Sequence, residues 1–401
     1  MRNWIKFAPI LTCLVFFIFF VSPVYGQMQS DVVVQRTYSL QESHGPLTIN
    51  GDAELVSNGW PGNGTLENPF VISGLNIISA YCGISIYNTQ LFFKIINCEI
   101  VSNNTDSTSP GIVFDRVQNG VVENCFVEGF NNGVSIYLSS DLSISSTRID
   151  SSEEDALTIH NSNSIDVDNC TISNSGFGSV VAYSSSLISF SELNLMVANW
   201  DGIRIDTCRL VSIIDSMIAS TIFCGISCYN SQNLVVSDCV IRSTSMDAIE
   251  SDLCRNITLV RCEVTDCVSG FGSIDSMKFH ASNNSFFNTN GVAIHSYHTP
   301  ETNVTGNAIN DCGEGIILST GSDDSSISSN SVSNVMVDGI YLSYSDNVVV
   351  ANNIVTESAE DGLEALSCSN VSLVGNEFHW FESWAGVDGM RIDSCELVKV
   401  E

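Results

Sequence analysis

The chain has 401 residues, of which 14 are Lys or Arg and 45 are Asp or Glu, so its formal net charge at pH 7 is −31. A surface this acidic repels nucleic-acid phosphates and anionic lipid headgroups, which excludes nucleic acid as a partner. It suits an extracellular protein whose charge keeps it soluble, or a protein that collects divalent cations.

The N-terminal residues have the pattern of an export signal. Arg2 and Lys6 precede an apolar run over residues 7–21, and small residues would allow cleavage after residue 26. We therefore expect a signal peptide at 1–26 and a secreted or cell-surface location, with an uncleaved membrane anchor as the alternative. No second apolar stretch of about 18 residues follows, so membrane contact is expected only through this signal or anchor.

The rest of the chain divides into a short entrance and a long repetitive part. Residues 27–45 are polar and irregular, as in a linker, and 46–80 should form an N-terminal cap and the first coil of a solenoid. Within it, 52–58 has a capping Asp and an apolar stripe, which predicts one or two helical turns. Repeats fill 81–401, and because Glu401 falls in mid-coil, we expect the natural chain to continue.

The repeat is visible as small or turn-forming residues that recur with a period of about 23 residues, which indicates stacked coils when it is built from short strands and turns. Helical repeats are excluded, because no stretch has the periodicity of an amphipathic helix. The turn positions are Gly83, Gly111, Gly133, Ala156, Ser179, Gly202, Gly225, Ala248, Phe271, Gly291, Gly315, Gly339, Gly362 and Gly389.

The segments 201–208 (DGIRIDTC) and 388–395 (DGMRIDSC) show the coil most clearly. After the turn, a strand alternates inward and outward side chains, with Ile203 and Ile205 pointing inward. A second strand and a short third strand complete the coil. The sequence therefore predicts an all-β fold, a single-stranded right-handed parallel β-helix of about 14 coils of about 23 residues with three short strands per coil.

Two ladders of small residues run through the coils. The first ends in five asparagines, one in each successive coil, whose amides could hydrogen-bond along the rod. Nine of the 15 cysteines occupy ladder positions, so we interpret them as buried filler. Disulfides between adjacent coils are the alternative for Cys98/Cys125, Cys239/Cys262 and Cys368/Cys395. The first ladder is Cys98, Cys125, Thr147, Cys170, Leu193, Ser216, Cys239, Cys262, Asn284, Asn307, Asn330, Asn353 and Asn376; the second is Thr89, Ser139, Ser162, Ser185, Cys208, Ser231, Cys254, Ser345, Cys368 and Cys395.

The segment 62–77 (GNGTLENPFVISGLNI) resembles the opening of exported archaeal β-helix proteins. The coils that follow resemble the NosD-like, carbohydrate-binding-and-sugar-hydrolase (CASH) type of β-helix repeat, over roughly residues 45–401. The resemblance implies the fold narrowly and the function broadly, because such rods include pectin-degrading enzymes, sugar binders and structural surface proteins. The motifs of polygalacturonase-like enzymes are absent. The six His are spread along the chain, which argues against a copper site.

The outward side chains of the first strands form two columns. Tyr rings can stack on sugar rings, and carboxylates can bind hydroxyl groups or Ca²⁺, so this face is a candidate polysaccharide surface. One column, the Tyr/Asp column, is predicted as Tyr87, Asp115, Tyr137, His160, Tyr183, Asp206, Tyr229, Asp252, Asp275 and His295. The other, the Arg/Glu column, contains Arg204, Glu250, Glu364 and Arg391. The candidate substrate-binding residues are Tyr137, His160, Tyr183, Asp206, Tyr229 and Glu250.

Three hypotheses about the function remain open. The first hypothesis is an exported protein that binds a polysaccharide or glycoconjugate. The second is a polysaccharide lyase or glycoside hydrolase, whose candidate catalytic residues are Asp252, Asp275 and Arg204; the two carboxylates would lie about 5 Å apart on adjacent coils. The third is a structural rod or adhesin without a small-molecule site. Ca²⁺ on the acidic residues is the candidate cofactor, and no other metal site is predicted.

Overall fold

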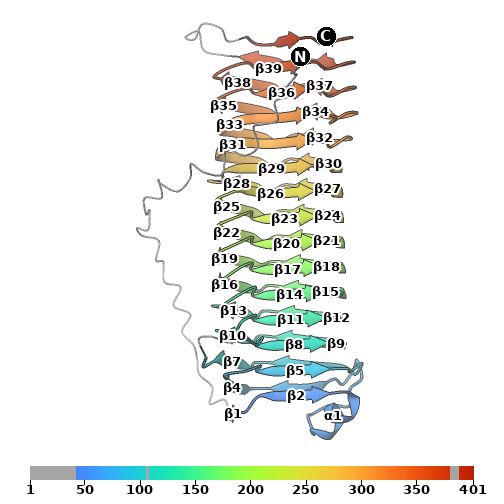
Figure 1. The fold of residues 1–401 in the computed structure, drawn as a ribbon, viewed down its shortest axis with the longest axis vertical. Helices are drawn as coiled ribbons and strands as arrows, with labels where there is room; N and C mark the ends of the chain where they lie inside the picture. The colour runs from blue at the N-terminus through green and yellow to red at the C-terminus, as the bar shows by residue number, and fades with distance from the viewer. Residues whose placement is uncertain (1–41, 105–107, 380–387) are drawn as a thin grey trace, which may run out of the picture. The chain divides into compact units, whose positions relative to one another are not determined.

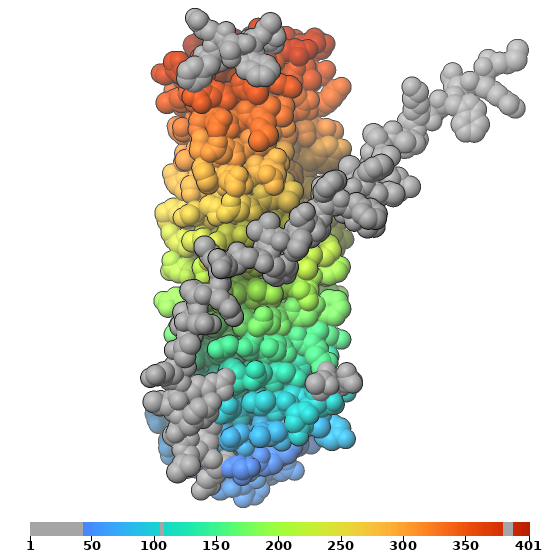
Figure 2. Space-filling model, turned by 90° about the vertical axis from the view of Figure 1, so that its left-hand side faces the viewer, coloured from blue at the N-terminus to red at the C-terminus, as the bar shows by residue number. Residues whose placement is uncertain are grey.

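The computed structural model describes residues 42–104, 108–379 and 388–401. They form a single-stranded parallel β-solenoid of about 14 coils of about 23 residues, so the predicted fold is confirmed (Figure 1). The space-filling view shows the coils as successive bands in chain order (Figure 2). The expected signal peptide, 1–26, and most of the expected linker, 27–45, lie outside the described residues.

The solenoid begins before the predicted first coil. Strand β1 (Glu42–His44) pairs with β4 (Leu75–Ser79), although the sequence suggested a linker there. The predicted helical turns are confirmed as α1 (Asp52–Ser57), which follows β2 (Leu47–Asn50) at the N-terminal end of the solenoid (Figure 1). The predicted capping role of Asp52 is wrong, because the N-cap is Gly51 and Asp52 is the first helical residue. Leu55 of α1 is fully buried and joins the core. In the described part of the chain, no helix is long and apolar enough to cross a membrane.

The strands of the described residues form two sheets in which every neighbouring pair is parallel. First and third strands share a 28-stranded sheet, and second strands form a 15-stranded sheet. The first strands after β2 are β5 (Ile84–Tyr87), β8 (Ile112–Asp115), β11 (Val134–Tyr137), β14 (Leu157–His160), β17 (Val180–Tyr183), β20 (Ile203–Asp206), β23 (Ile226–Tyr229), β26 (Asp247–Asp252), β29 (Ser269–Ile274), β36 (Ile340–Ser343), β39 (Leu363–Leu366) and β42 (Arg391–Asp393). The second strands are β3 (Phe70–Ser73), β6 (Phe93–Ile96), β9 (Gln118–Glu123), β12 (Ser140–Ser145), β15 (Asn163–Asp168), β18 (Ser186–Ser191), β21 (Arg209–Ile214), β24 (Gln232–Ser237), β27 (Arg255–Val260), β30 (Met277–Ser282), β32 (Asn303–Thr305), β34 (Ser326–Ser328), β37 (Val349–Ala351), β40 (Ser372–Val374) and β43 (Lys399–Val400). The third strands after β4 are β7 (Glu99–Ser102), β10 (Phe126–Glu128), β13 (Arg148–Asp150), β16 (Thr171–Ser175), β19 (Asn194–Ala198), β22 (Met217–Thr221), β25 (Val240–Thr244), β28 (Glu263–Thr265), β35 (Ser331–Val335), β38 (Ile354–Ser358) and β41 (Glu377–His379).

Two coils depart from the pattern of three short strands. In β31 (Ser285–Tyr297) and β33 (Ala308–Ser319) a third strand continues through the turn into the next first strand. The two long strands pair with each other, and their register shifts between Thr289 and Val292. The irregularity absorbs the change in turn length at this point of the solenoid.

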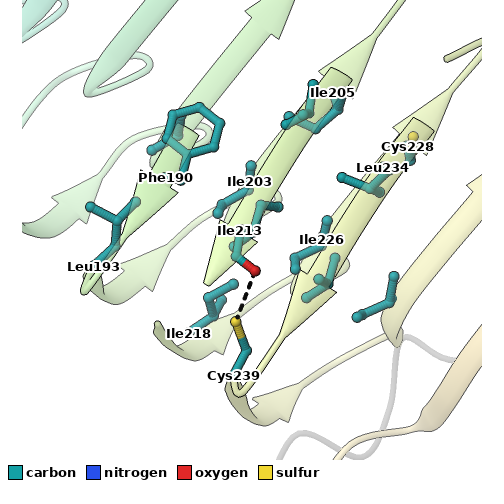
Figure 3. Close-up of a cluster of buried hydrophobic side chains, with 14 of the residues drawn as sticks. Phe190, Leu193, Ile203, Ile205, Ile213, Ile218, Ile226, Cys228, Leu234 and Cys239 are labelled. Atoms are coloured by element: carbon teal, nitrogen blue, oxygen red, sulfur yellow. Dashed lines mark hydrogen bonds between the residues drawn. The ribbon is translucent and has the colours of Figure 1, made fainter. Parts of the chain in front are cut away.

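The interior is filled by the alternate side chains that the pattern places inward. Figure 3 shows Ile203, Ile205 and Ile226 from first strands in one buried cluster with Ile213 and Ile218 from the other two strands of a coil. All five are fully buried. Burying each such side chain contributes about 1.5 to 3 kcal/mol, which is why the alternation alone specifies the strand faces.

The small residue at each turn is required by the neighbouring coil. A Cβ on Gly202 would lie 2.6 Å from the carbonyl oxygen of Gly225, closer than real contacts allow. The sequence-based turn positions Phe271 and Gly291 are wrong, because Gly270 and Ala293 occupy these positions in the structure. A Cβ on Gly270 would lie 2.1 Å from the carbonyl oxygen of Ala293. The side chain of Phe271 is fully buried in the core.

The asparagine ladder is confirmed as a continuous hydrogen-bonded chain. Nδ2 of Asn307 donates to Oδ1 of Asn330 at 2.9 Å, and Nδ2 of Asn330 donates to Oδ1 of Asn353 at 2.9 Å. Oδ1 of Asn330 also accepts the backbone N–H of Asn307 at 2.9 Å, and Oδ1 of Asn353 accepts the backbone N–H of Asn330 at 3.0 Å. The ladder begins at Asn284 and ends at Asn376. Each amide thus satisfies buried backbone groups as well as its neighbour.

The cysteines of the described residues are all free thiols, and most are buried, as expected of filler. The alternative of disulfides at Cys98/Cys125, Cys239/Cys262 and Cys368/Cys395 is not realised in the structure. Two thiols that were not expected to meet do so, because Sγ of Cys228 and Sγ of Cys254 lie 3.3 Å apart. Their contact crosses from a first strand to a ladder position of the next coil.

Candidate functional site

The outward side chains of the first strands form the predicted Tyr/Asp column through most of its length. Tyr137 lies opposite His160, and His160 opposite Tyr183. The rings of Tyr137 and His160 stack with centroids 5.3 Å apart, and those of His160 and Tyr183 are 6.0 Å apart. Burial lowers the pKa of His160, which favours the neutral ring. The confirmed members are Tyr87, Asp115, Tyr137, His160, Tyr183, Asp206, Tyr229 and Asp252.

Asp275 does not belong to this column. The residue opposite Asp252 is Ile274, because the step to this coil is one residue shorter than the preceding step from Tyr229 to Asp252. A slip of one residue turns a side chain away from its expected face. Asp275 instead pairs with His298, with Oδ1 and Nδ1 3.1 Å apart. The predicted pairing of Asp252 and Asp275 on equivalent positions of adjacent coils is therefore wrong.

His295 also lies outside the Tyr/Asp column, in the neighbouring Arg/Glu column. The register of that column runs from Arg204 through Ser227, Glu250 and Gly272 to His295. The predicted placement of Arg204 and Glu250 in one column is confirmed. They are two coils apart, so they do not form a direct pair.

A ridge of apolar side chains, which the sequence-based reasoning missed, borders these columns. Phe177, Trp200 and Phe223 occupy the same turn position in three successive coils, and the rings of Trp200 and Phe223 stack at 4.0 Å. The backbone N–H of Phe223 donates to the carbonyl of Trp200 at 3.3 Å, which aligns the turns. Phe177 is 50% exposed and Trp200 38% exposed. The ridge could have been recognised in the sequence, because aromatic residues recur at the spacing of the repeat, directly before the turn.

A pocket of about 260 Å³ opens beside this ridge. It exists because two positions that carry larger side chains in the next coil are small here: Gly178 stands where the next coil has Asp201, and Val181 of the Arg/Glu column lies opposite Arg204. A Cβ on Gly178 would lie 3.1 Å from the carboxylate of Asp155, so even one added carbon would narrow the space. The lining residues are Asp155, Phe177, Gly178, Val181, Trp200, Asp201 and Arg204.

The two carboxylates of the pocket are held by neutral donors. Oδ1 of Asp155 accepts the N–H of Gly178 at 2.8 Å. Oδ1 of Asp201 accepts the N–H of Cys224 at 3.0 Å, and its Oδ2 accepts the hydroxyl of Ser227 at 2.7 Å. Asp201, the first residue of DGIRIDTC, is thus hydrogen-bonded to the next coil. These bonds fix its side chain at the rim of the pocket.

Burial dominates the electrostatics of this region. It raises the pKa of Asp155 and that of Asp201, and the positive charge of Arg204 opposes the shift in both. The guanidinium of Arg204 lies 3.7 Å from the carboxylate of Asp206, so these two candidate site residues are in contact. Burial and the charge of a neighbouring carboxylate raise the pKa of Glu250, another predicted site residue.

Glu250, two coils beyond Arg204, belongs to a second group of titratable side chains. Its Oε2 accepts the thiol of Cys224 at 3.4 Å. Burial raises the pKa of Asp247 to about 6 and lowers that of His295. Asp247 and His295 reach toward each other over Gly272, with Oδ2 and Nε2 3.8 Å apart, and a Cβ on that glycine would lie within 2.7 Å of both atoms. The missing side chain lets acid and imidazole share one space.

A third acidic group lies near the C-terminal end of the solenoid. The carboxylates of Asp338, Asp361 and Glu364 can place one oxygen each within 4.8 Å of the others. Arg391 already pairs with Glu364 at 3.0 Å. Burial, followed by the neighbouring negative charges, raises the pKa of Glu314 to about 7 and contributes to a pKa of about 6 for Asp338.

These raised pKa values predict that Glu314 and Asp338 stabilise the folded chain more in mild acid than in mild base. The folded chain binds the protons of Glu314 and Asp338 more tightly than the unfolded chain, whose carboxyl pKa values lie near 4. Their contribution to stability is most favourable below about pH 4 and declines as the pH rises through their folded pKa values. We expect a higher urea midpoint at about pH 5 than at about pH 8, and a smaller difference in Glu314→Gln. Exposed Glu67 provides the control, because Glu67→Gln should keep the wild-type difference; an unchanged difference in Glu314→Gln would refute the assignment.

Comparison with known families places this solenoid. The profile of the family described as "Periplasmic copper-binding protein (NosD)" matches residues 27–200, 117–301 and 214–380 in overlapping segments. These matches cover most of the chain, which therefore belongs to the NosD family of parallel β-helix proteins. A search of curated proteins gives no match.

The described residues do not fit the copper of the family's description. Copper favours imidazole and sulfur ligands. Among the described residues, the one group of three or more His, Cys, Asp or Glu side chains within reach of a single ion is the carboxylate set of Asp338, Asp361 and Glu364. Such oxygen ligands suit Ca²⁺, Mg²⁺ or Mn²⁺ instead.

Solved structures resemble the chain in fold alone. The Streptococcus pneumoniae surface adhesin PfbA has 11% identity and a TM-score of 0.45, over 82% of this chain and 91% of its own. The A-module of the Azotobacter vinelandii mannuronan C-5 epimerase AlgE4 has 12% identity and a TM-score of 0.39, over 88% of each chain. The enzymatically active domain of bacteriophage CBA120 tailspike protein 2 has 13% identity and a TM-score of 0.43, over 58% of this chain. The chain spans 43% of that tailspike domain and 38% of the full-length tailspike.

Proposed function

We propose that the chain binds a polysaccharide along the outer face of its first strands, with the pocket between Phe177 and Trp200 as the central subsite. The observation that carries the proposal is the juxtaposition of exposed aromatic rings with carboxylates and a guanidinium around a space of about 260 Å³. Aromatic rings provide apolar faces on which sugar rings can stack, and charged groups fix the hydroxyls. Tyr183 and Tyr229 would extend contact along the Tyr/Asp column.

We further propose that the protein acts outside the cytoplasm, secreted or at the cell surface. The basic and apolar pattern of residues 1–26 supports export, and the family is described as periplasmic. Fractionation of the native host, with mass-spectrometric identification of the mature N-terminus, tests this; the bulk of the chain in the cytoplasm with an intact Met1 would contradict it.

Replacing Trp200 by alanine is expected to weaken oligosaccharide binding about tenfold or more, equivalent to about 1.4 kcal/mol, because the pocket loses its largest stacking surface. Isothermal titration calorimetry with a panel of hexasaccharides measures the effect. Val235→Ala, at an exposed apolar site on β24 in the other sheet, is the control and should bind as the wild type does. Binding that survives both Trp200→Ala and Tyr229→Ala would place the ligand elsewhere.

A lyase or hydrolase is the second candidate function. Burial and the nearby charge of Asp275 raise the pKa of Asp252, as suits a general acid, although the two carboxylates do not share a register position. Arg204 lies in the neighbouring column, two coils away from this acid. Release of reducing ends or unsaturated products that is lost in Asp252→Asn would support catalysis, and the absence of any product from wild type would reject it. If no saturable binding occurs either, the rod or adhesin hypothesis stands.

Ca²⁺ is the candidate cofactor of the proposed function, on Asp338, Asp361 and Glu364 rather than at the pocket. Three carboxylate oxygens within 4.8 Å of one another support this placement. A melting temperature that is the same in CaCl₂ and in a chelator would count against it.

A further inference from the structure

The pocket and the coil two steps beyond it contain more carboxyl groups than basic side chains. Asp155 and Asp201 line the pocket, and Asp247 and Glu250 lie together on β26, two coils further along the same face. Arg204 is the one basic residue among those that line the pocket, and it is shared with the outward carboxylate of Asp206 at 3.7 Å. The hydroxyl, thiol and backbone N–H groups that hold these acids are neutral, so they orient the carboxylates without cancelling their charge.

Aromatic rings stand beside the same carboxylates. Trp200 and Phe177 both line the pocket and are both partly exposed. The face of an aromatic ring attracts an ammonium group, most strongly for Trp. A space lined by aromatic rings and carboxylates is therefore complementary to an organic amine. An anionic sugar would instead meet like charges at short distance, and each such contact is unfavourable.

The apolar ridge has the extent that a polymeric ligand would need. After Phe177, Trp200 and Phe223, the same turn position carries Met246 and Val268, both exposed. These are five successive coils, and neighbouring coils lie about 4.8 Å apart. This rise is close to the length of one sugar residue, so a glycan laid along the ridge can place successive residues on successive coils. A single amine or one lysine side chain would use only the pocket.

We propose that the polysaccharide bound here is built from amino sugars with free, protonated amino groups. This inference rests on the proposed function and names its substrate class. The amino group of one residue would sit in the pocket between Trp200 and the carboxylates of Asp155 and Asp201, and the following residues would run along the ridge toward Val268.

Calorimetry with a matched pair of ligands tests the substrate class on the full chain. The probes are a hexamer of β-linked glucosamine and its fully N-acetylated form, at about pH 6, below the ordinary pKa of an amine. We expect the glucosamine hexamer to bind about tenfold more tightly. Raising NaCl from about 50 to about 500 mM should weaken the binding of this hexamer only, because salt screens charge pairs.

Asp155→Asn tests the charge at the pocket directly. It keeps an oxygen that can accept the N–H of Gly178, so the turn should be preserved. We expect it to weaken glucosamine-hexamer binding about five- to tenfold, within the range of a lost charge-assisted contact, and to leave the N-acetylated hexamer unaffected. The control is Asp166→Asn, an exposed acid on β15 of the same coil in the other sheet, which should change neither. Circular dichroism of each variant establishes that it is folded.

The outcomes separate this inference from the proposed function. Equal affinity for both hexamers, or salt-independent binding, would overturn the amino-sugar assignment and leave polysaccharide binding intact. Tighter binding of an oligouronate in the presence of Ca²⁺, or of an oligolysine peptide, would also overturn it. If neither hexamer nor any other glycan of the panel binds, the proposed function itself fails.

Discussion

Replacing Asn330 by alanine is expected to lower the free energy of unfolding by about 3 to 5 kcal/mol. The side chain is 1% exposed and lies in the middle of the asparagine ladder. Its Oδ1 accepts both the backbone N–H and Nδ2 of Asn307 at 2.9 Å, and its Nδ2 donates to the carbonyl of Val304 at 3.0 Å and to Asn353. Alanine leaves these buried groups without partners, and each costs about 1 to 3 kcal/mol.

The end of the ladder provides a graded control. Asn376 accepts from Asn353 in the same way but is only partly buried, so water can replace its side chain. Asn376→Ala should therefore cost clearly less than Asn330→Ala. Urea denaturation monitored by circular dichroism measures both. Equal unfolding midpoints for wild type and Asn330→Ala would show that the ladder does not stabilise the solenoid.

Replacing Val181 by phenylalanine is expected to lower the affinity for the glycan by more than about tenfold. Val181 points outward from β17, opposite Arg204, and its small side chain leaves the space of about 260 Å³ open. A phenyl ring would fill that space without changing any charge. Because the side chain points out of the core, we expect the melting temperature to change little.

The matched control for this variant is Val349→Phe. Val349 is exposed on β37 of the 15-stranded sheet, away from the first-strand face. It receives the same added ring and should keep wild-type affinity. Retained binding in Val181→Phe, measured by calorimetry with the glycan that wild type binds, would mean that the pocket is not the subsite.

The course of the chain could be predicted because each coil repeats the same local rules. Inward side chains such as Ile203 and Ile205 alternate with outward ones, and a small residue such as Gly202 marks the turn. The regular recurrence then stacks equivalent positions, so the ladder from Asn284 to Asn376 could be read as a hydrogen-bonded row. Period, alternation and turn chemistry are properties of neighbouring residues, which a sequence displays directly.

The register failed where the period changed by one residue. Asp275 was placed beside Asp252 by assuming a constant period, but the step to this coil is one residue shorter, and Ile274 occupies the position. The local sequence does not show that this coil is one residue shorter, because the residues on either side of Asp275 fit both registers. Backbone pairing with the neighbouring coils decides between the frames, because a one-residue slip would expose the core face and bury the polar one.

The candidate site depended on tertiary structure even more. Phe177, Trp200 and Phe223 are visible in the sequence at the spacing of the repeat, yet as turn residues they gave no strand signal. Gly178 and Val181 are important because they are small, since the pocket is the space that larger side chains fill in the next coil. Likewise, Gly272 admits Asp247 and His295 into one space.

The sequence by itself therefore determined the class of fold, the inward and outward faces of the strands, the ladders and the acidic character of the surface. These follow from local patterning and composition, which act over a few residues or over the whole chain. Only the tertiary structure decided which outward residues are neighbours, where the surface is hollow and which carboxylates share a space. Those properties depend on register and on the volume of side chains one coil away, and stacking the coils is what brings such residues into contact.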